Sequence, residues 1–146
     1  DHRDLHSFPT RRSSDLAPEN IKETITNGRN GIMTPFGSVL GADGVKDVAN
    51  YVRSMNGLAH DSVRAQRGKE AFDNNCVACH GADAKGNPML GAPNLTDNLW
   101  LYGSTEATII ETVTNGRNNQ MPAFGAFLGE DKVHILTAYV LSLSKK

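Results

Sequence analysis

The segment Cys76–Val77–Ala78–Cys79–His80 constrains this chain of 146 residues more than any other feature of its sequence. Two thiols separated by two residues suit the two vinyl groups of one haem, and the adjacent histidine is then held against the iron. These two cysteines are the only ones in the chain. A structural zinc site needs a second pair of ligands, and a thioredoxin-like redox pair needs a strand–helix–strand setting that the flanking sequence lacks. The motif therefore predicts haem c attached to Cys76 and Cys79, with His80 on the iron.

Residues 1–16 read DHRDLHSFPTRRSSDL, and we interpret them as the translation of a common sequencing-library adapter. The other interpretation is a basic targeting peptide. A secretory signal would contain an apolar core, and a transit peptide would avoid the three aspartates of this segment. Residues 1–16 are therefore treated as an artefact, and the natural sequence is expected to begin near Ala17.

Composition limits the function classes of the remaining part. The net charge of −1 argues against nucleic acid as a partner and against strong attraction to a membrane surface. No apolar run approaches the roughly 20 residues that span a bilayer, so a membrane anchor is expected only in missing upstream sequence. About 130 residues suffice for one domain with a core or for two very small ones. Attachment of haem c implies export, because bacteria carry out this ligation on the outer side of the inner membrane.

An internal repeat with an offset of 88 residues relates the two ends of the chain. The stretch Glu23–Gly37 reads ETITNGRNGIMTPFG, and Glu111–Gly125 reads ETVTNGRNNQMPAFG. The match continues to the motif YVxS near the end of each copy. The chain is therefore expected to contain the carboxy-terminal half of a first copy in residues 17–57 and a complete second copy in residues 61–146.

The complete copy is predicted to be all-α. Its main helices are expected at Ser62–Asn75, Ser104–Asn115 and Glu130–Ser144. Asp61 or Ser62 can cap the first helix, and Gly81–Asn98 is rich enough in Gly, Pro and Asn to form an irregular loop. Gly68 and Phe72 share one face of the first helix, where a glycine permits close approach of another helix. The buried face of the last helix is expected to contain Val133, Leu136, Tyr139, Val140 and Leu143.

The iron needs a ligand opposite His80. The candidates in the complete copy are Met89, Met121, His134 and His60. Met89 follows His80 closely and is expected to pack on the proximal side, and most histidines placed like His134 are surface residues. Met121 lies in the extended segment MPAFG, which Pro122 stiffens, where the chain can cross the far face of the ring. Methionine is often only core filler, but Met33 recurs at the same repeat position and favours Met121 as a ligand. Methionine opposite histidine raises the reduction potential and suits electron transfer.

The motifs CVACH, GAPNL, WLYG, NGR and MPAFG, with the closing YVLSLS, resemble class I cytochrome c domains. More narrowly, the tandem from Ala17 onward is similar to the dihaem subunit III (CcoP or FixP type) of cbb3-type cytochrome c oxidases. The resemblance implies two His/Met haems in the full-length protein and one haem c in this chain. It also implies an upstream transmembrane anchor and a place on the periplasmic side of the bacterial inner membrane. Such a subunit is no catalyst on its own, and it passes electrons from a donor cytochrome c toward the catalytic and monohaem subunits.

The resemblance assigns roles to individual residues. Cys76 and Cys79 form the thioethers, His80 is the proximal ligand, Met121 is the distal ligand, and the carbonyl of Pro93 orients His80. The residues Trp100, Tyr102 and Arg117 line the haem or meet a propionate, although core aromatics and an exposed arginine are equally good interpretations. The last helix would cross the first helix near Tyr139.

The resemblance also implies that Met33 is the distal ligand of a first haem whose CxxCH motif is absent, so Met33 is expected to bind no haem. Residues 17–57 would then be two helices with an uncovered apolar face. The linker 56–61 is short and flexible, and the half-domain folds back on the complete copy or stays mobile.

Two alternatives remain open. One is a free or lipid-anchored tandem dihaem carrier of the periplasm that belongs to no oxidase. The other is an enzyme, such as a peroxidase-like haem protein or the cytochrome domain of a dehydrogenase, which needs a vacant sixth position on the iron or a second catalytic domain.

Overall fold

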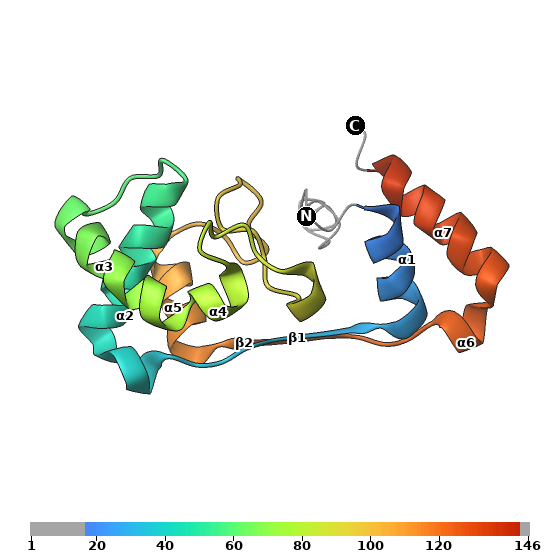
Figure 1. Cartoon of the computed structure of the whole chain (residues 1–146), viewed down its shortest axis with the longest axis horizontal. Coiled ribbons are helices and arrows are strands. Elements are labelled where there is room, and N and C mark those ends of the chain that lie inside the picture. Colours follow the sequence, from blue (N-terminus) through green and yellow to red (C-terminus); the bar gives the residue numbers. More distant parts are fainter. Residues whose placement is uncertain (1–16, 144–146) are drawn as a thin grey trace, which may run out of the picture. The chain divides into compact units, whose positions relative to one another are not determined.

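The computed structural model describes residues 17–143 and divides the chain into two compact units (Figure 1). The central unit is Ile32–Asn118, and the terminal unit combines residues 17–31 with residues 119–143. The described residues are mostly helical, as the sequence predicts. Two short strands, β1 (Arg29–Met33) and β2 (Arg117–Met121), pair into a sheet that the sequence analysis did not predict, and the boundary between the units falls within both strands.

The helices of the central unit are α2 (Gly37–Met55), α3 (Ser62–Asn75), α4 (Val77–His80), the 3-10 turn η3 (Pro88–Leu90) and α5 (Glu106–Asn115). The bounds of α3 are those predicted, and the Asp61 carboxylate caps this helix by accepting from two backbone N–H groups. Helix α5 begins two residues later than expected, because Thr105 is its cap and accepts from the backbone N–H of Thr108. Local capping thus determines where both helices begin.

The apolar face of α2 is buried in the central unit. Val45, Val48, Ala49 and Val52 are at most 4% exposed and recur with helical spacing. They belong to a central cluster that also contains Phe72, Cys76, Ala84, Ile109 and Val113. The expectation that residues 17–57 leave an apolar face uncovered is therefore wrong for α2, because α3 and α5 cover it.

Helices α2 and α3 cross with almost no space between their backbones. A Cβ atom added at Gly68 would lie 2.0 Å from the carbonyl oxygen of Asp47. One turn further along α3, the ring of Phe72 meets the ring of Tyr51 edge-on, with 5.3 Å between the centroids. The sequence predicts the close approach at Gly68 correctly but assigns the wrong partner: the tyrosine found there is Tyr51, 88 positions before Tyr139 in the repeat.

An ion-pair cluster closes one edge of this crossing. The carboxylate of Asp47 on α2 accepts from Arg64 at 2.7 Å and from Arg67 at 2.8 Å, both on α3. Asp47 is only 7% exposed. The hydrogen bond from Arg67 is the main reason why the pKa of this carboxyl lies below its usual value, and Arg64 adds to the effect although burial opposes it.

The effect of replacing the Asp47 carboxylate on stability is expected to depend on pH. A depressed pKa stabilises the fold above the ordinary value of 3.8, and this contribution is lost as the pH falls below that value. We expect Asp47→Asn to be less stable than the parent at pH 7 and the difference to shrink at pH 3. Denaturant unfolding at the two pH values measures it. A difference that stays constant between them would contradict the role of the charge.

The terminal unit contains α1 (Pro18–Asn27), α6 (Gly125–Leu128) and α7 (Glu130–Leu143). Its small core consists of Ile21, Ile25 and Val133. Of the face predicted to be buried on α7, Val133 is buried, whereas Leu136, Tyr139 and Leu143 are 38%, 59% and 43% exposed. The correction has a simple cause: within this unit α7 packs mainly on the ten-residue α1, which is too short to cover the whole face (Figure 1).

Between residues 17 and 143, no helix combines the length and the apolar character that crossing a membrane requires. The interpretation of residues 1–16 as an adapter, and the expected end of the last helix at Ser144, lie outside the described residues.

Candidate haem c site

One helical turn brings both cysteines and His80 together. Cys76 lies between α3 and α4 and caps both helices, and its N–H donates to the carbonyl of Phe72 at 2.8 Å. Its own carbonyl accepts from the N–H of Cys79 at 3.2 Å and from that of His80 at 2.9 Å. Cys76 and His80 are buried, at 7% and 8% exposure, whereas Cys79 is exposed. The turn thus presents two thiols and one imidazole in the order that covalent haem attachment requires.

The ring of His80 is oriented by Pro93. Its Nδ1 lies 3.0 Å from the carbonyl oxygen of Pro93, and because a carbonyl only accepts, Nδ1 carries the proton and donates it. This tautomer leaves Nε2 as the ring nitrogen with a lone pair for a metal. The contact is the one that the family resemblance implies for Pro93.

The loop after α4 is folded back tightly to hold that carbonyl. Asn87 and Ala92 form an isolated bridge with N···O distances of 2.9 and 3.0 Å, and the N–H of Gly86 donates to the carbonyl of His80 at 2.8 Å. Gly86 has φ +83°, and a Cβ there would lie 2.5 Å from the Ala92 oxygen and from the Pro93 carbonyl carbon. Only glycine fits between the two sides of the loop, so this residue fixes the position of the Pro93 carbonyl.

Burial changes the chemistry of the first thiol. Desolvation raises the pKa of Cys76 to about 11, with a smaller contribution from Cys79. At neutral pH Cys76 is therefore a protonated thiol, unlike the activated thiolates of redox enzymes. This state favours an attachment or structural role over thiol–disulfide catalysis.

The three residues expected around the haem all lie in the central unit. Trp100 packs partly buried against the central cluster. The guanidinium of Arg117 lies 4.1 Å from the ring centroid of Tyr102 and pairs with Glu111 at 3.2 Å. It also donates to the hydroxyl of Thr112 at 2.7 Å. Arg117 thus has protein partners, and a part for these residues in binding haem stays a prediction.

The four candidates for the sixth ligand are spread over the two units. Met89 is 89% exposed on η3, so the expectation that it packs is wrong. His60 and His134 are exposed, and Met121 is 37% exposed in the terminal unit. Met33, which the sequence analysis left without a partner, lies in the central unit and packs against the cluster that contains Cys76. The repeat could have indicated this position of Met33, because Met33 and Met121 are equivalent in the repeat and either could lie beside the cluster.

The residues present fit haem better than a bare metal ion. Within the part of the chain that the structure describes, no three His, Cys, Asp or Glu side chains gather into a metal-binding cluster. Haem needs only two axial ligands from the protein, because the porphyrin nitrogens supply the rest. A single oriented histidine beside a CxxC turn satisfies this requirement, with a methionine to complete it.

Comparisons with known proteins agree with this geometry. Residues 63–140 match the family described as cytochrome c oxidase, cbb3-type, subunit III. The FixP subunit of the cbb3-type oxidase of Azorhizobium caulinodans is 46% identical over 132 aligned positions, and the alignment covers 84% of this chain and 45% of that protein. The FixP subunit of Bradyrhizobium sp. (strain ORS 278) is 47% identical over 136 aligned positions, and the alignment covers 86% of this chain and 47% of that protein.

The CcoP subunit of Rubrivivax gelatinosus is 42% identical over 150 aligned positions, and the alignment covers 99% of this chain and 49% of that protein. This alignment extends into residues 1–16, whose interpretation as an adapter stays a prediction. The chain spans about half the length of these curated relatives. Since the family match covers more than half of the chain and includes the turn that bears Cys76, Cys79 and His80, the chain belongs to the subunit III family of cbb3-type cytochrome c oxidases.

Proposed function

We propose that this chain is a haem c electron-transfer protein that relays electrons from a donor cytochrome c to the catalytic subunits of a cbb3-type terminal oxidase. The observation that carries the proposal is the CxxCH turn whose histidine is oriented through Nδ1 by the Pro93 carbonyl. Family membership and the oxidase subunits among the relatives favour this role over a free or lipid-anchored tandem dihaem carrier.

Each residue of the site has a distinct role in this proposal. Cys76 and Cys79 would hold haem c through thioethers, and His80, which the Pro93 carbonyl orients, would ligate its iron through Nε2. When bound, haem c takes up and releases one electron, and the protein adjusts its potential through axial ligands and burial. The exposure of Cys79 keeps one edge of the attachment turn at the surface, where a redox partner can approach.

Family membership supports the proposed setting. The full-length protein carries two haems and this chain one, because residues 17–57 belong to a first copy whose CxxCH is absent. We place the haem domain on the periplasmic side of the bacterial inner membrane, with a membrane anchor upstream. The partners are a donor cytochrome c and the catalytic and monohaem subunits of the oxidase.

The test is the ratio of haem to polypeptide after export in a host with cytochrome c maturation, measured by intact mass and a pyridine haemochrome spectrum. We expect one covalently attached haem. The double variant Cys76→Ser, Cys79→Ser is the matched control and should carry none. Folded parent protein without haem would overturn the proposal, and metal binding or thiol chemistry would then be the remaining roles for the two cysteines.

A further inference from the structure

Each unit contains an equivalent internal contact, and in both units this contact joins a residue of one repeat copy to a residue of the other. In the central unit the N–H of Phe36 donates to the carbonyl of Val113 at 2.9 Å. In the terminal unit the N–H of Phe124 donates to the carbonyl of Ile25, also at 2.9 Å. Phe36 and Phe124 are repeat equivalents, as are Ile25 and Val113. Each junction therefore joins one copy to the other, where an unexchanged repeat would join each copy to itself.

Glycines at the same junctions repeat the pattern. A Cβ at Gly116 would lie 2.2 Å from the carbonyl oxygen of Met33, and a Cβ at Gly28 would lie 2.4 Å from that of Met121. Both glycines have positive φ, at +68° and +71°. The chain after each methionine therefore passes against the glycine of the opposite copy, at a distance that no other residue allows.

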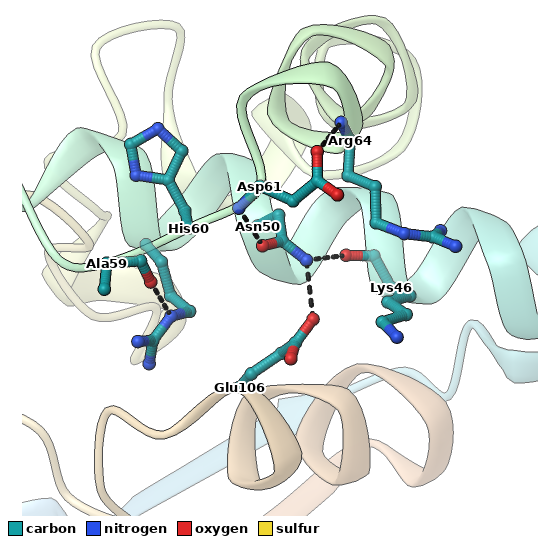
Figure 2. Close-up of a pocket in the computed structure, with 8 residues that line it drawn as sticks. Lys46, Asn50, Ala59, His60, Asp61, Arg64 and Glu106 are labelled. Carbon is teal, nitrogen blue, oxygen red and sulfur yellow. Dashed lines mark hydrogen bonds between the residues drawn. The ribbon is translucent and has the colours of Figure 1, made fainter.

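Polar side chains explain why α2, rather than α7, packs against α3 and α5 in the central unit. Asp47 pairs with Arg64 and Arg67. Asn50 donates to Glu106 at 2.7 Å and accepts from the N–H of Asp61 at 2.8 Å (Figure 2). Arg53 donates to the carbonyl of Ala59 at 2.8 Å and to that of Ser104. In α7 the equivalents of Asp47, Asn50 and Arg53 are Ile135, Ala138 and Leu141.

This difference decides which helix binds α3 and α5. The apolar faces are only partly alike: Val45, Tyr51 and Val52 correspond to Val133, Tyr139 and Val140, whereas Leu136 and Thr137 stand at the positions of Val48 and Ala49. With α7 in place of α2, the two arginines of α3 would face Ile135 and lose their carboxylate. The unpaired charge at the helix crossing would disfavour α7 as the partner of α3, whereas the carboxylate of Asp47 favours α2.

We propose that the first copy supplies the closing segment of the haem domain in this chain, so that Met33, not Met121, is the methionine opposite His80. The inference deepens the haem c function proposed above and rests on it. The family match covers residues 63–140, which run from α3 to α7, and so implies that the closing helix follows the haem motif in sequence. In the proposed arrangement the closing helix is α2, which precedes that motif. The exposed face of α7 and the 37% exposure of Met121 agree with the exchange, because both lie outside the central unit.

The repeat supplies a matched pair of variants for the test. Met33→Ala and Met121→Ala are produced with cytochrome c maturation, and the sulfur-to-iron charge-transfer band of the ferric protein and the axial methionine methyl signal in the proton NMR spectrum of the ferrous protein are recorded. We expect both signals to disappear in Met33→Ala and to persist in Met121→Ala, with one covalent haem in each variant. Loss in Met121→Ala only, or persistence in both variants, would overturn the exchange and leave the haem function intact. A parent protein without haem would defeat the proposed function instead.

A second measurement is independent of the iron ligand. Tyr51→Ala removes the ring that packs on Phe72, so hydrogen exchange of the α3 amides in the haem-loaded protein should accelerate by about tenfold or more. Tyr139→Ala, its repeat equivalent, should leave α3 unchanged. Acceleration by Tyr139→Ala with no effect of Tyr51→Ala would show that α7 closes the haem domain and would overturn the proposal.

Discussion

Gly68→Ala is expected to force α2 and α3 apart and to lower the free energy of unfolding of the central unit by about 3 kcal/mol or more. The added Cβ would lie 2.0 Å from the Asp47 carbonyl oxygen, 2.4 Å from its carbon and 2.9 Å from the nitrogen of Val48. All three are backbone atoms, so no side chain can rotate away to make room. The gain of about 1 kcal/mol in helix propensity on replacing glycine by alanine is too small to compensate.

The measurement is denaturant unfolding followed by tryptophan fluorescence. Trp100 is the only tryptophan of the chain and packs against the central cluster, so its signal reports on the central unit. Gly44→Ala on α2 is the matched control, because its Cβ would meet only the side chain of Leu40, at 3.1 Å. We expect a change of less than about 1 kcal/mol for the control. Equal effects of the two variants would show that the crossing at Gly68 is not tightly packed.

Phe72→Ala is expected to destabilise the same unit by about 3–5 kcal/mol. Phe72 is 2% exposed and is among the largest fully buried side chains of the described residues. Its removal leaves a cavity in the cluster next to Cys76 and deprives Tyr51 of its edge-on partner. We therefore also expect a lower yield of haem-loaded protein, because the attachment turn follows directly from the end of α3.

The control for this variant is Phe127→Ala. Phe127 is 84% exposed in the terminal unit, and its truncation should change the stability by less than about 0.5 kcal/mol. The same fluorescence titration compares the two. A small effect of Phe72→Ala would mean that the cluster collapses around the missing ring, and the packing described for α2 and α3 would then have to be looser than the structure indicates.

Local features of the haem motif could be predicted from the sequence. Ser62–Asn75 is the helix that the spacing predicts, Asp61 caps it, and the irregular loop returns the Pro93 carbonyl to His80. Each depends on residues close in the chain or on a motif with few geometric solutions. The strands were not predicted, because Asn and Gly have low strand propensity and the pairing joins two segments that are far apart in the sequence.

The choice of the closing helix could not be predicted from hydrophobic pattern. Val45 and Val133 are equivalent by spacing, and both are 1% exposed, although in different units. A tandem repeat offers two solutions with similar apolar burial. The ion pairs distinguish them most clearly, and their meaning is apparent once Asp47 is seen beside Arg64 and Arg67.

The short connection between α2 and α3 also has a consequence for the order of folding. Asp47 and Arg64 are 17 residues apart in sequence. A partner on α7 would enclose roughly four times as many residues, which adds about 1.2 kcal/mol to the entropy of loop closure. In a chain synthesised from its amino terminus, α2 and α3 are both available before α7 exists. The hairpin of α2 and α3 can therefore form while the second closing segment is still being translated, so kinetics and charge favour the same pairing.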